Sequence, residues 1–276
     1  MRIGLFALAM ASLCAVASAS SITDLTTWTL VQDPAHERMT AFVNPLGDAS
    51  LNANGPVPSG TDIGYASIDG PDVASSSAGY YFDPSSSFSV AIDFVLLTRS
   101  TTGAAGIGFG IGEDAGGADS AGIGLGAING QPVAFSTAGR INDVDQPLQL
   151  LTTTPTVSTS GGGAIVGSSG RFFVEYDSIT KNVILGVSTT PGAASPSETQ
   201  TLAAIGAAWD ADPLLVSFFL RSQSISIIPA IQSGLVRATF SNFEVLSGTP
   251  ISIPEPHSAA LATLALLASW RFPRQR

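Results

Sequence analysis

The stretch Phe88-Ser-Val-Ala-Ile-Asp-Phe-Val-Leu-Leu97 carries the clearest strand pattern in the chain. Large apolar residues stand at every second position from Phe88 to Phe94, with Ser, Ala and Asp between them. Because successive side chains of a strand point to opposite faces, this alternation predicts a strand that buries one face in a core. The fold is therefore expected to be built from strands that pack face to face.

Two glycine-rich segments follow, Gly106-Ile-Gly-Phe-Gly-Ile-Gly112 and Gly122-Ile-Gly-Leu-Gly-Ala-Ile128. As strands, both place their large side chains on one face and mostly bare glycine on the other. Glycine weakens the interior of a strand unless another group approaches closely there. With the acidic loop 113–120 between them, the two segments are predicted to form a long hairpin.

Strand patterns recur along the rest of the body, separated by turns rich in Gly, Pro, Asn and Asp. They cover residues 22–31, 65–68, 131–137, 171–176, 183–187, 214–220 and 234–246. Residues 202–209 are the one helical candidate in the body. About ten to fourteen strands with almost no helix predict an all-β fold, an antiparallel jelly-roll β-sandwich over residues 20–247.

The N-terminus has the three parts of a secretory signal peptide. Met1-Arg2 is followed by an apolar run over residues 3–16 and by the small residues Ala17-Ser-Ala19. We expect residues 1–19 to form a signal helix that signal peptidase removes after Ala19. Cys14, the one cysteine, leaves with this segment, which excludes disulfides and thiolate metal sites from the mature chain.

The C-terminus begins, after a linker over 248–253, with Pro254-Glu255-Pro256 and continues as an uncharged apolar run over 258–270. A helix over that run would be about 20 Å long, short of the roughly 30 Å hydrocarbon core of a bilayer. The basic residues Arg271, Arg274 and Arg276 close the chain and are expected on the cytoplasmic side of a membrane.

The order of these parts over residues 254–276 resembles the PEP-CTERM sorting signal of exported bacterial proteins, although the apolar run is shorter than usual. The resemblance implies a short hydrophobic helix that inserts transiently in the inner membrane and processing by an exosortase. It also implies that the mature protein is located outside the cell or on the bacterial cell surface.

The body resembles the concanavalin A-like (laminin-G-like) jelly rolls at Val174-Glu-Tyr-Asp-Ser-Ile-Thr-Lys-Asn182 and at the closing segment 238–245. That superfamily contains sugar-binding lectins, glycan hydrolases, lyases and adhesive modules. The resemblance therefore implies carbohydrate binding as one function without choosing among these classes.

Residues 20–253 carry seven basic and 20 acidic residues, a formal net charge of −13. Such a chain repels phosphate backbones, so nucleic acid is not expected as a partner.

Acidic residues supply the candidate chemistry. Glu113, Asp114 and Asp119 lie in one glycine-rich loop and form a candidate calcium site, the one cofactor considered, with a solvated acidic loop tip as the alternative. A second and weaker group of oxygen ligands is Asn142, Asp143 and Asp145.

Glu175 and Asp177 stand two apart on one predicted strand and would face the same way, as paired acids of a glycosidase do. The further acid that some jelly-roll glucanases carry is missing, because Ile179 and Thr180 follow. Asp177 is therefore expected to open a turn. Five aromatic residues are candidates to stack on sugar rings, but aromatic side chains usually fill the core and most of these are expected there: Trp28, Tyr80, Tyr81, Phe82 and Trp209.

Three functional hypotheses result. The first is an exported, non-enzymatic matrix or adhesive protein that touches extracellular polysaccharide. The second is a secreted glycoside hydrolase or polysaccharide lyase that uses Glu175, Asp177 or Glu113 as acids. The third is a structural surface protein without a ligand.

Overall fold

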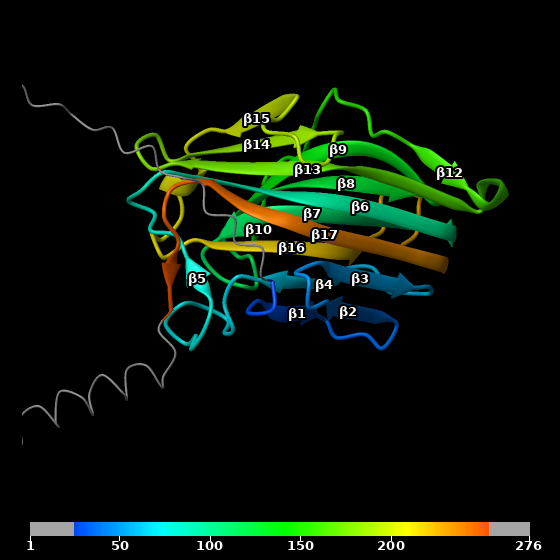
Figure 1. The fold of residues 1–276 in the computed structure, drawn as a ribbon, viewed down its shortest axis with the longest axis horizontal. Helices are drawn as coiled ribbons and strands as arrows, with labels where there is room; N and C mark the ends of the chain where they lie inside the picture. The colour runs from blue at the N-terminus through cyan, green and yellow to red at the C-terminus, as the bar shows by residue number, and fades with distance from the viewer. Residues whose placement is uncertain (1–24, 254–276) are drawn as a thin grey trace, which may run out of the picture.

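A computed structural model describes residues 25–253 of the chain (Figure 1). The predicted signal peptide and the tail from Pro254 onward lie outside the described residues. Within them, two eight-stranded antiparallel sheets face each other as the layers of a sandwich. No helix among residues 25–253 has the length and apolar character needed to cross a membrane.

The first sheet contains the predicted glycine hairpin. In spatial order its strands are β1 (Thr29–Asp33), β4 (Thr61–Ala66), β16 (Leu215–Ser222), β7 (Ala104–Gly112), β8 (Ser120–Ile128), β9 (Gln131–Ile141) and β10 (Val144–Asp145), and β11 (Gln149–Leu150) also pairs with β9.

The second sheet contains the predicted strand that begins at Phe88. In spatial order its strands are β15 (Glu198–Leu202), β14 (Asn182–Ser188), β13 (Ile165–Asp177), β6 (Phe88–Thr102), β17 (Ser233–Ser247), β3 (Ala49–Asn54) and β2 (Met39–Val43), and β12 (Ser158–Ser160) pairs with β13. The remaining elements are the two-stranded pair β5 (Tyr80–Tyr81) and β18 (Ile251–Ser252) and the short 3-10 helices η1 (Gly161–Gly163) and η2 (Ile205–Ala207).

The alternation in β6 is confirmed, because its large apolar residues at every second position are buried, namely Phe88, Val90, Ile92 and Phe94. The opposite face of β6 is less open than expected. Asp93 is only 8% exposed, since it accepts hydrogen bonds from the Gly192 amide (2.9 Å) and from Asn242 Nδ2 (3.1 Å) and lies beside the buried Arg171. A polar cluster thus covers the outer face of the second sheet at its centre.

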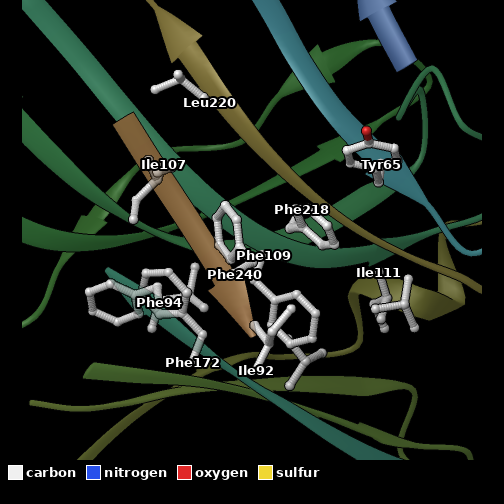
Figure 2. Close-up of a cluster of buried hydrophobic side chains, with 14 of the residues drawn as sticks. Tyr65, Ile92, Phe94, Ile107, Phe109, Ile111, Phe172, Phe218, Leu220 and Phe240 are labelled. Carbon is white, nitrogen blue, oxygen red and sulfur yellow. The ribbon is translucent and has the colours of Figure 1, made fainter. Parts of the chain in front are cut away.

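Aromatic side chains fill the space between the sheets (Figure 2). Phe94 of β6 stacks on Phe172 of β13, with ring centroids 4.2 Å apart, and both meet Phe135 of β9 edge to face. Phe218 of the first sheet packs on Phe240 of the second at 4.5 Å. These contacts join the two layers into one core, and the predicted antiparallel jelly-roll sandwich is confirmed.

Some local predictions differ from the structure. The strand expected from residue 22 begins at Thr29, because a turn from Leu25 to Trp28 precedes it. The helical candidate 202–209 contains only η2. The expected linker 248–253 includes β18, and Ile253 donates a hydrogen bond to the Gly79 carbonyl (2.9 Å), so the body holds this segment to its surface.

Candidate functional site

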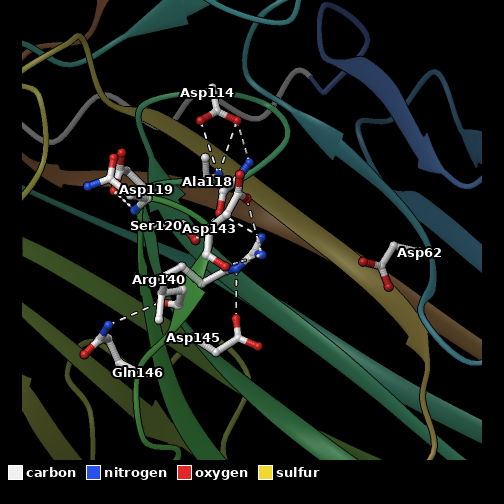
Figure 3. A network of polar contacts seen from close by, with 12 residues as sticks. Asp62, Asp114, Ala118, Asp119, Ser120, Arg140, Asp143, Asp145 and Gln146 are labelled. Atoms are coloured by element: carbon white, nitrogen blue, oxygen red, sulfur yellow. Dashed lines mark hydrogen bonds and ion pairs between the residues drawn. The ribbon is translucent and has the colours of Figure 1, made fainter.

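The three carboxylates of the candidate calcium loop bind separate backbone amides. Asp114 accepts hydrogen bonds from Gly117 (2.6 Å) and Ala118 within its own turn, as Figure 3 shows. Asp119 accepts one from the Asn142 amide (2.8 Å), and Glu113 points the other way, toward residues 210–212. Among residues 25–253 no three metal-binding side chains lie together. Calcium binding here stays a prediction of the sequence.

The second group of oxygen ligands is organised around an arginine. Arg140 of β9 reaches Asp145 (Nε to Oδ1, 2.8 Å) and Asp143 (Nη2 to Oδ1, 3.4 Å). It also donates to the Gly117 carbonyl (3.2 Å), so it ties the β9–β10 turn to the acidic loop (Figure 3). The charges in this region are therefore engaged with one another.

Asp177 opens a turn, as the sequence predicts. Its carboxylate accepts hydrogen bonds from the Ile179 amide (2.9 Å) and the Thr180 hydroxyl (2.6 Å), and the Thr180 bond leads in lowering its pKa. Glu175 is exposed on the same strand, and Tyr176 between them is buried. Trp28, Tyr80, Phe82 and Trp209 are buried too, which confirms the core role of these aromatics, whereas Tyr81 is partly exposed.

A different aromatic residue faces outward. In β16, Phe218 and Leu220 belong to the core, so Phe219 and Arg221 between and beside them lie on the outer face of the first sheet. The pairing register sets Phe219 between Gly64 of β4 and Gly108 of β7. It sets Arg221 between Asp62 and Gly106.

Arg221 and Asp62 form a bidentate ion pair on this face. Arg221 Nε donates to Asp62 Oδ1 (2.6 Å), and its Nη2 donates to Oδ2. The hydrogen bond to Asp62 raises the pKa of Arg221 above its ordinary value. The Arg221 guanidinium lies over the Phe219 ring, 5.6 Å from its centroid. The Asp62 and Arg221 side chains remain 25% and 42% exposed, so both can still contact a ligand.

Across the sheet from Arg221 and from Phe219, the next residues on β7 and β8 are glycines. Gly106 of β7 is opposite Gly126 of β8, and Gly108 is opposite Gly124. At Gly108 an added Cβ would lie 2.5 Å from the Phe219 ring, and at Gly124 it would lie 2.6 Å from the Ile107 carbonyl oxygen. Close packing therefore explains these two glycines.

Close packing does not explain the glycines at positions 106 and 126. A Cβ on Gly106 would meet nothing nearer than 3.7 Å, and a Cβ on Gly126 would meet Val133 Cγ2 at 3.7 Å. Neither has a positive φ. The surface above this opposed pair is therefore open although the local packing would accept a side chain.

Apolar side chains border the far side of the bare surface. Val133 beside Gly126 is 46% exposed, and Leu150 of β11, paired with Ser136 of β9, is 68% exposed. From β16 to β11 the face spans four strand spacings, about 19 Å. We call this surface the outer strip: Gly106, Gly122, Gly124 and Gly126, bordered by Asp62, Phe219 and Arg221 on one side and by Val133 and Leu150 on the other.

Comparison with known proteins identifies the fold alone. No family model and no curated protein sequence matches the chain. Solved structures that align with it include the alginate lyase from Klebsiella pneumoniae (11% identity, 78% of this chain and 86% of that chain, TM-score 0.44). They also include the β-glucanase of Bacillus licheniformis (9%, 81% and 94%, 0.44) and lectin II from Ulex europaeus (10%, 82% and 98%, 0.42).

These neighbours correct one prediction from the sequence. The first hypothesis described a protein that is not an enzyme, yet structures with this strand arrangement include an alginate lyase and a β-glucanase beside the lectin. The non-enzymatic assignment is therefore withdrawn. The fold is shared by proteins of both kinds, so a function has to be argued from the side chains of this chain.

The sequence did not identify the border residues of the outer strip. The run Leu214-Leu-Val-Ser-Phe-Phe-Leu220 is almost continuously apolar and indicates a strand buried on both faces. The alternating glycines alone indicate this surface in the sequence, because they predict a close approach of another group.

Proposed function

We propose that the protein binds a neutral, linear polysaccharide along the outer strip. The observation that carries the proposal is the opposed pair Gly106 and Gly126, left without side chains although the space above Gly106 is open. Backbone without side chains lets a flat ring approach closely.

The borders supply the contacts that a sugar chain needs. Phe219 is half-buried, and the apolar faces of sugar rings pack on the exposed part of such a side chain. Asp62 and Arg221 provide acceptors and donors in fixed positions, since their bidentate pair holds both side chains. On the opposite border, Leu150 and Val133 cover apolar ring faces.

Charge selects the class of polysaccharide. The positive charge of Arg221 is matched by Asp62, so the strip has no unpaired cation for an acidic polysaccharide. Residues 20–253 as a whole have a formal net charge of −13, which repels polyanions at low salt. A neutral glycan needs no unpaired cation and is not repelled by the net negative charge.

We further propose that the chain works outside the cell. The sequence pattern of residues 1–19 supports removal by signal peptidase, and that of 254–276 supports insertion in the inner membrane and processing by an exosortase. The mature protein would then act at the bacterial cell surface or in the extracellular matrix, where polysaccharide is present.

Affinity electrophoresis tests the binding proposal. The full chain is run in native gels that contain hydroxyethyl cellulose, xylan or dextran, and in gels that contain alginate or polygalacturonate. We expect retardation by at least one neutral polymer and none by the two polyanions. Gly106→Leu, which fills open space, should weaken the retardation at least tenfold.

The matched control is Thr201→Leu, which adds a similar side chain at an exposed site on β15 of the other sheet. It should leave the retardation unchanged. Equal retardation of the two variants, retardation only by the polyanions, or no retardation by any of the five polymers would each refute the proposal.

A further inference from the structure

A cavity of about 290 Å³ lies at the end of the sandwich, away from the outer strip. Two aromatic residues form part of its wall, Trp209 and Tyr176, and η2 and the β13–β14 turn supply other parts. Glu113 and Lys181 also line it. It therefore combines an anion and a cation with aromatic side chains in a volume near the lower end for ligand sites.

The carboxylate of Glu113 is held by two backbone amides. Its two carboxylate oxygens accept hydrogen bonds from the amides of Asp210 (2.9 Å) and Asp212 (2.8 Å). Between them Ala211 has a left-handed φ of 64°, so the two amides form a concave anion-binding turn. The carboxylate is thereby fixed in position beside the cavity.

The same carboxylate keeps capacity for a ligand. A carboxylate has about four acceptor sites, and the two backbone amides take two of them. Burial raises the pKa of Glu113 above its ordinary value, although the two hydrogen bonds from the amides lower it. The nearby charges of Asp119 and Asp212 raise it further. A hydroxyl donor from a ligand would therefore stabilise the ionised form.

Lys181 supplies donors from another side. Its ammonium group donates to the Pro84 carbonyl (3.0 Å) and lies 5.7 Å from the Tyr176 ring centroid. An ammonium has three donors, so the bond to Pro84 leaves others for a ligand. The main chain at residue 181 has a left-handed φ of 58° in the β13–β14 turn, and the Lys181 side chain lines the cavity.

We propose that this cavity binds one neutral sugar ring, such as the end of a glycan chain. The ring hydroxyls would donate to Glu113 and accept from Lys181, and an apolar ring face would contact Trp209. One carboxylate and one ammonium favour a ring without net charge. This site is separate from the outer strip, and its assignment does not depend on polysaccharide binding there.

Trp209 provides the readout, because its indole lies in the cavity wall. The full chain is titrated with methyl β-glucoside, methyl β-galactoside and methyl α-mannoside while tryptophan fluorescence is recorded. We expect a saturable change for at least one sugar, with a Kd on the order of 1 mM, equivalent to about −4 kcal/mol. Trp209→Phe should abolish the signal, because the other described tryptophan, Trp28, is not in the cavity lining.

Adjacent alanines give a matched pair of variants. Ala207 lines the cavity and is exposed, so Ala207→Phe should fill it and weaken binding at least tenfold without removing a hydrogen bond. Ala208 is also exposed but is not in the lining, so Ala208→Phe should bind as the wild type does. Gly106→Leu on the outer strip should also leave this titration unchanged.

Three results would overturn the assignment. They are the absence of a saturable change with all three sugars, equal affinity of the Ala207→Phe and Ala208→Phe variants, and loss of the response in Gly106→Leu. The last result would place the sugar on the outer strip instead. Failure of the polymer to bind in the gels, with an intact fluorescence response, would reject the outer strip alone.

Discussion

Phe218 and Phe219 are adjacent and chemically identical, yet one is fully buried and the other is partly exposed over glycine. Strand geometry turns neighbours to opposite faces, so a shift of one residue would exchange their environments. The partners across the sheet fix the register: Phe219 fits because Gly64 and Gly108 on either side have no side chains. Which residue is tolerated at a position of β16 therefore depends on its partners on the two neighbouring strands.

Glu198 gives a prediction at the residue scale. Its carboxylate accepts hydrogen bonds from the Thr152 and Thr153 amides (2.8 and 2.5 Å) and holds the loop before β12 to β15. The Thr152 amide bond leads in lowering the pKa of Glu198 from 4.5 to about 2. A depressed carboxyl pKa stabilises the fold above pH 4.5, and that contribution is lost as the pH falls toward 2.

We therefore expect Glu198→Gln to have a shallower loss of stability than wild type between pH 4.5 and pH 2. Urea unfolding at a series of pH values measures this difference. Glu175→Gln, which changes an exposed acid on β13 of the same sheet, serves as the control. Parallel pH profiles for wild type and Glu198→Gln would contradict the assignment.

The element that shapes the outer face is the hairpin of β7 and β8. Its alternating glycines look equivalent in the sequence but have two causes in the structure. At Gly124 the neighbouring backbone fills the place of a Cβ, whereas at Gly106 the place is empty. The hairpin is thus closely packed at the Gly108–Gly124 pair and open at the Gly106–Gly126 pair.

A pair of alanine variants separates these causes. Gly124→Ala should lower the free energy of unfolding by about 1–3 kcal/mol, because its Cβ would lie 2.6 Å from the Ile107 oxygen. Gly106→Ala should leave stability unchanged or raise it by up to about 1 kcal/mol, since it restricts the unfolded chain at an unstrained position. Chemical denaturation of both variants measures the difference, and equal effects would show that the two glycines serve the same purpose.

For the whole molecule, the position of the last described strand matters. β18 pairs with β5, and Ile253 is still hydrogen-bonded to Gly79. Pro254 follows at once and has no amide hydrogen, so this pairing ends where the proposed sorting motif starts. Residues 251–253 are thus held to the body beside β5, immediately before the proposed sorting motif in the sequence (Figure 1).

Processing gives a prediction at this scale. Mass spectrometry of the exported protein should find a chain that begins at Ser20 and ends near residue 255, because both terminal segments have the sequence pattern of cleavable sorting signals. The protein retained in the cell serves as the comparison and should contain longer species. An intact C-terminus at Arg276 in the exported fraction would contradict processing.

The fold class, the glycine hairpin and the turn at Asp177 can be predicted from the amino-acid sequence alone, because each depends on neighbours along the chain: alternation, glycine spacing and a side chain that accepts hydrogen bonds within its own turn. The sequence does not reveal that Glu113 binds the amides of residues 210 and 212, or that Asp62 pairs with Arg221, 159 residues away. Strand register and the packing of two sheets bring such groups together, and no local pattern encodes them. The positions of the open surface and of the cavity therefore follow from the packing of the two sheets and from no local pattern of residues.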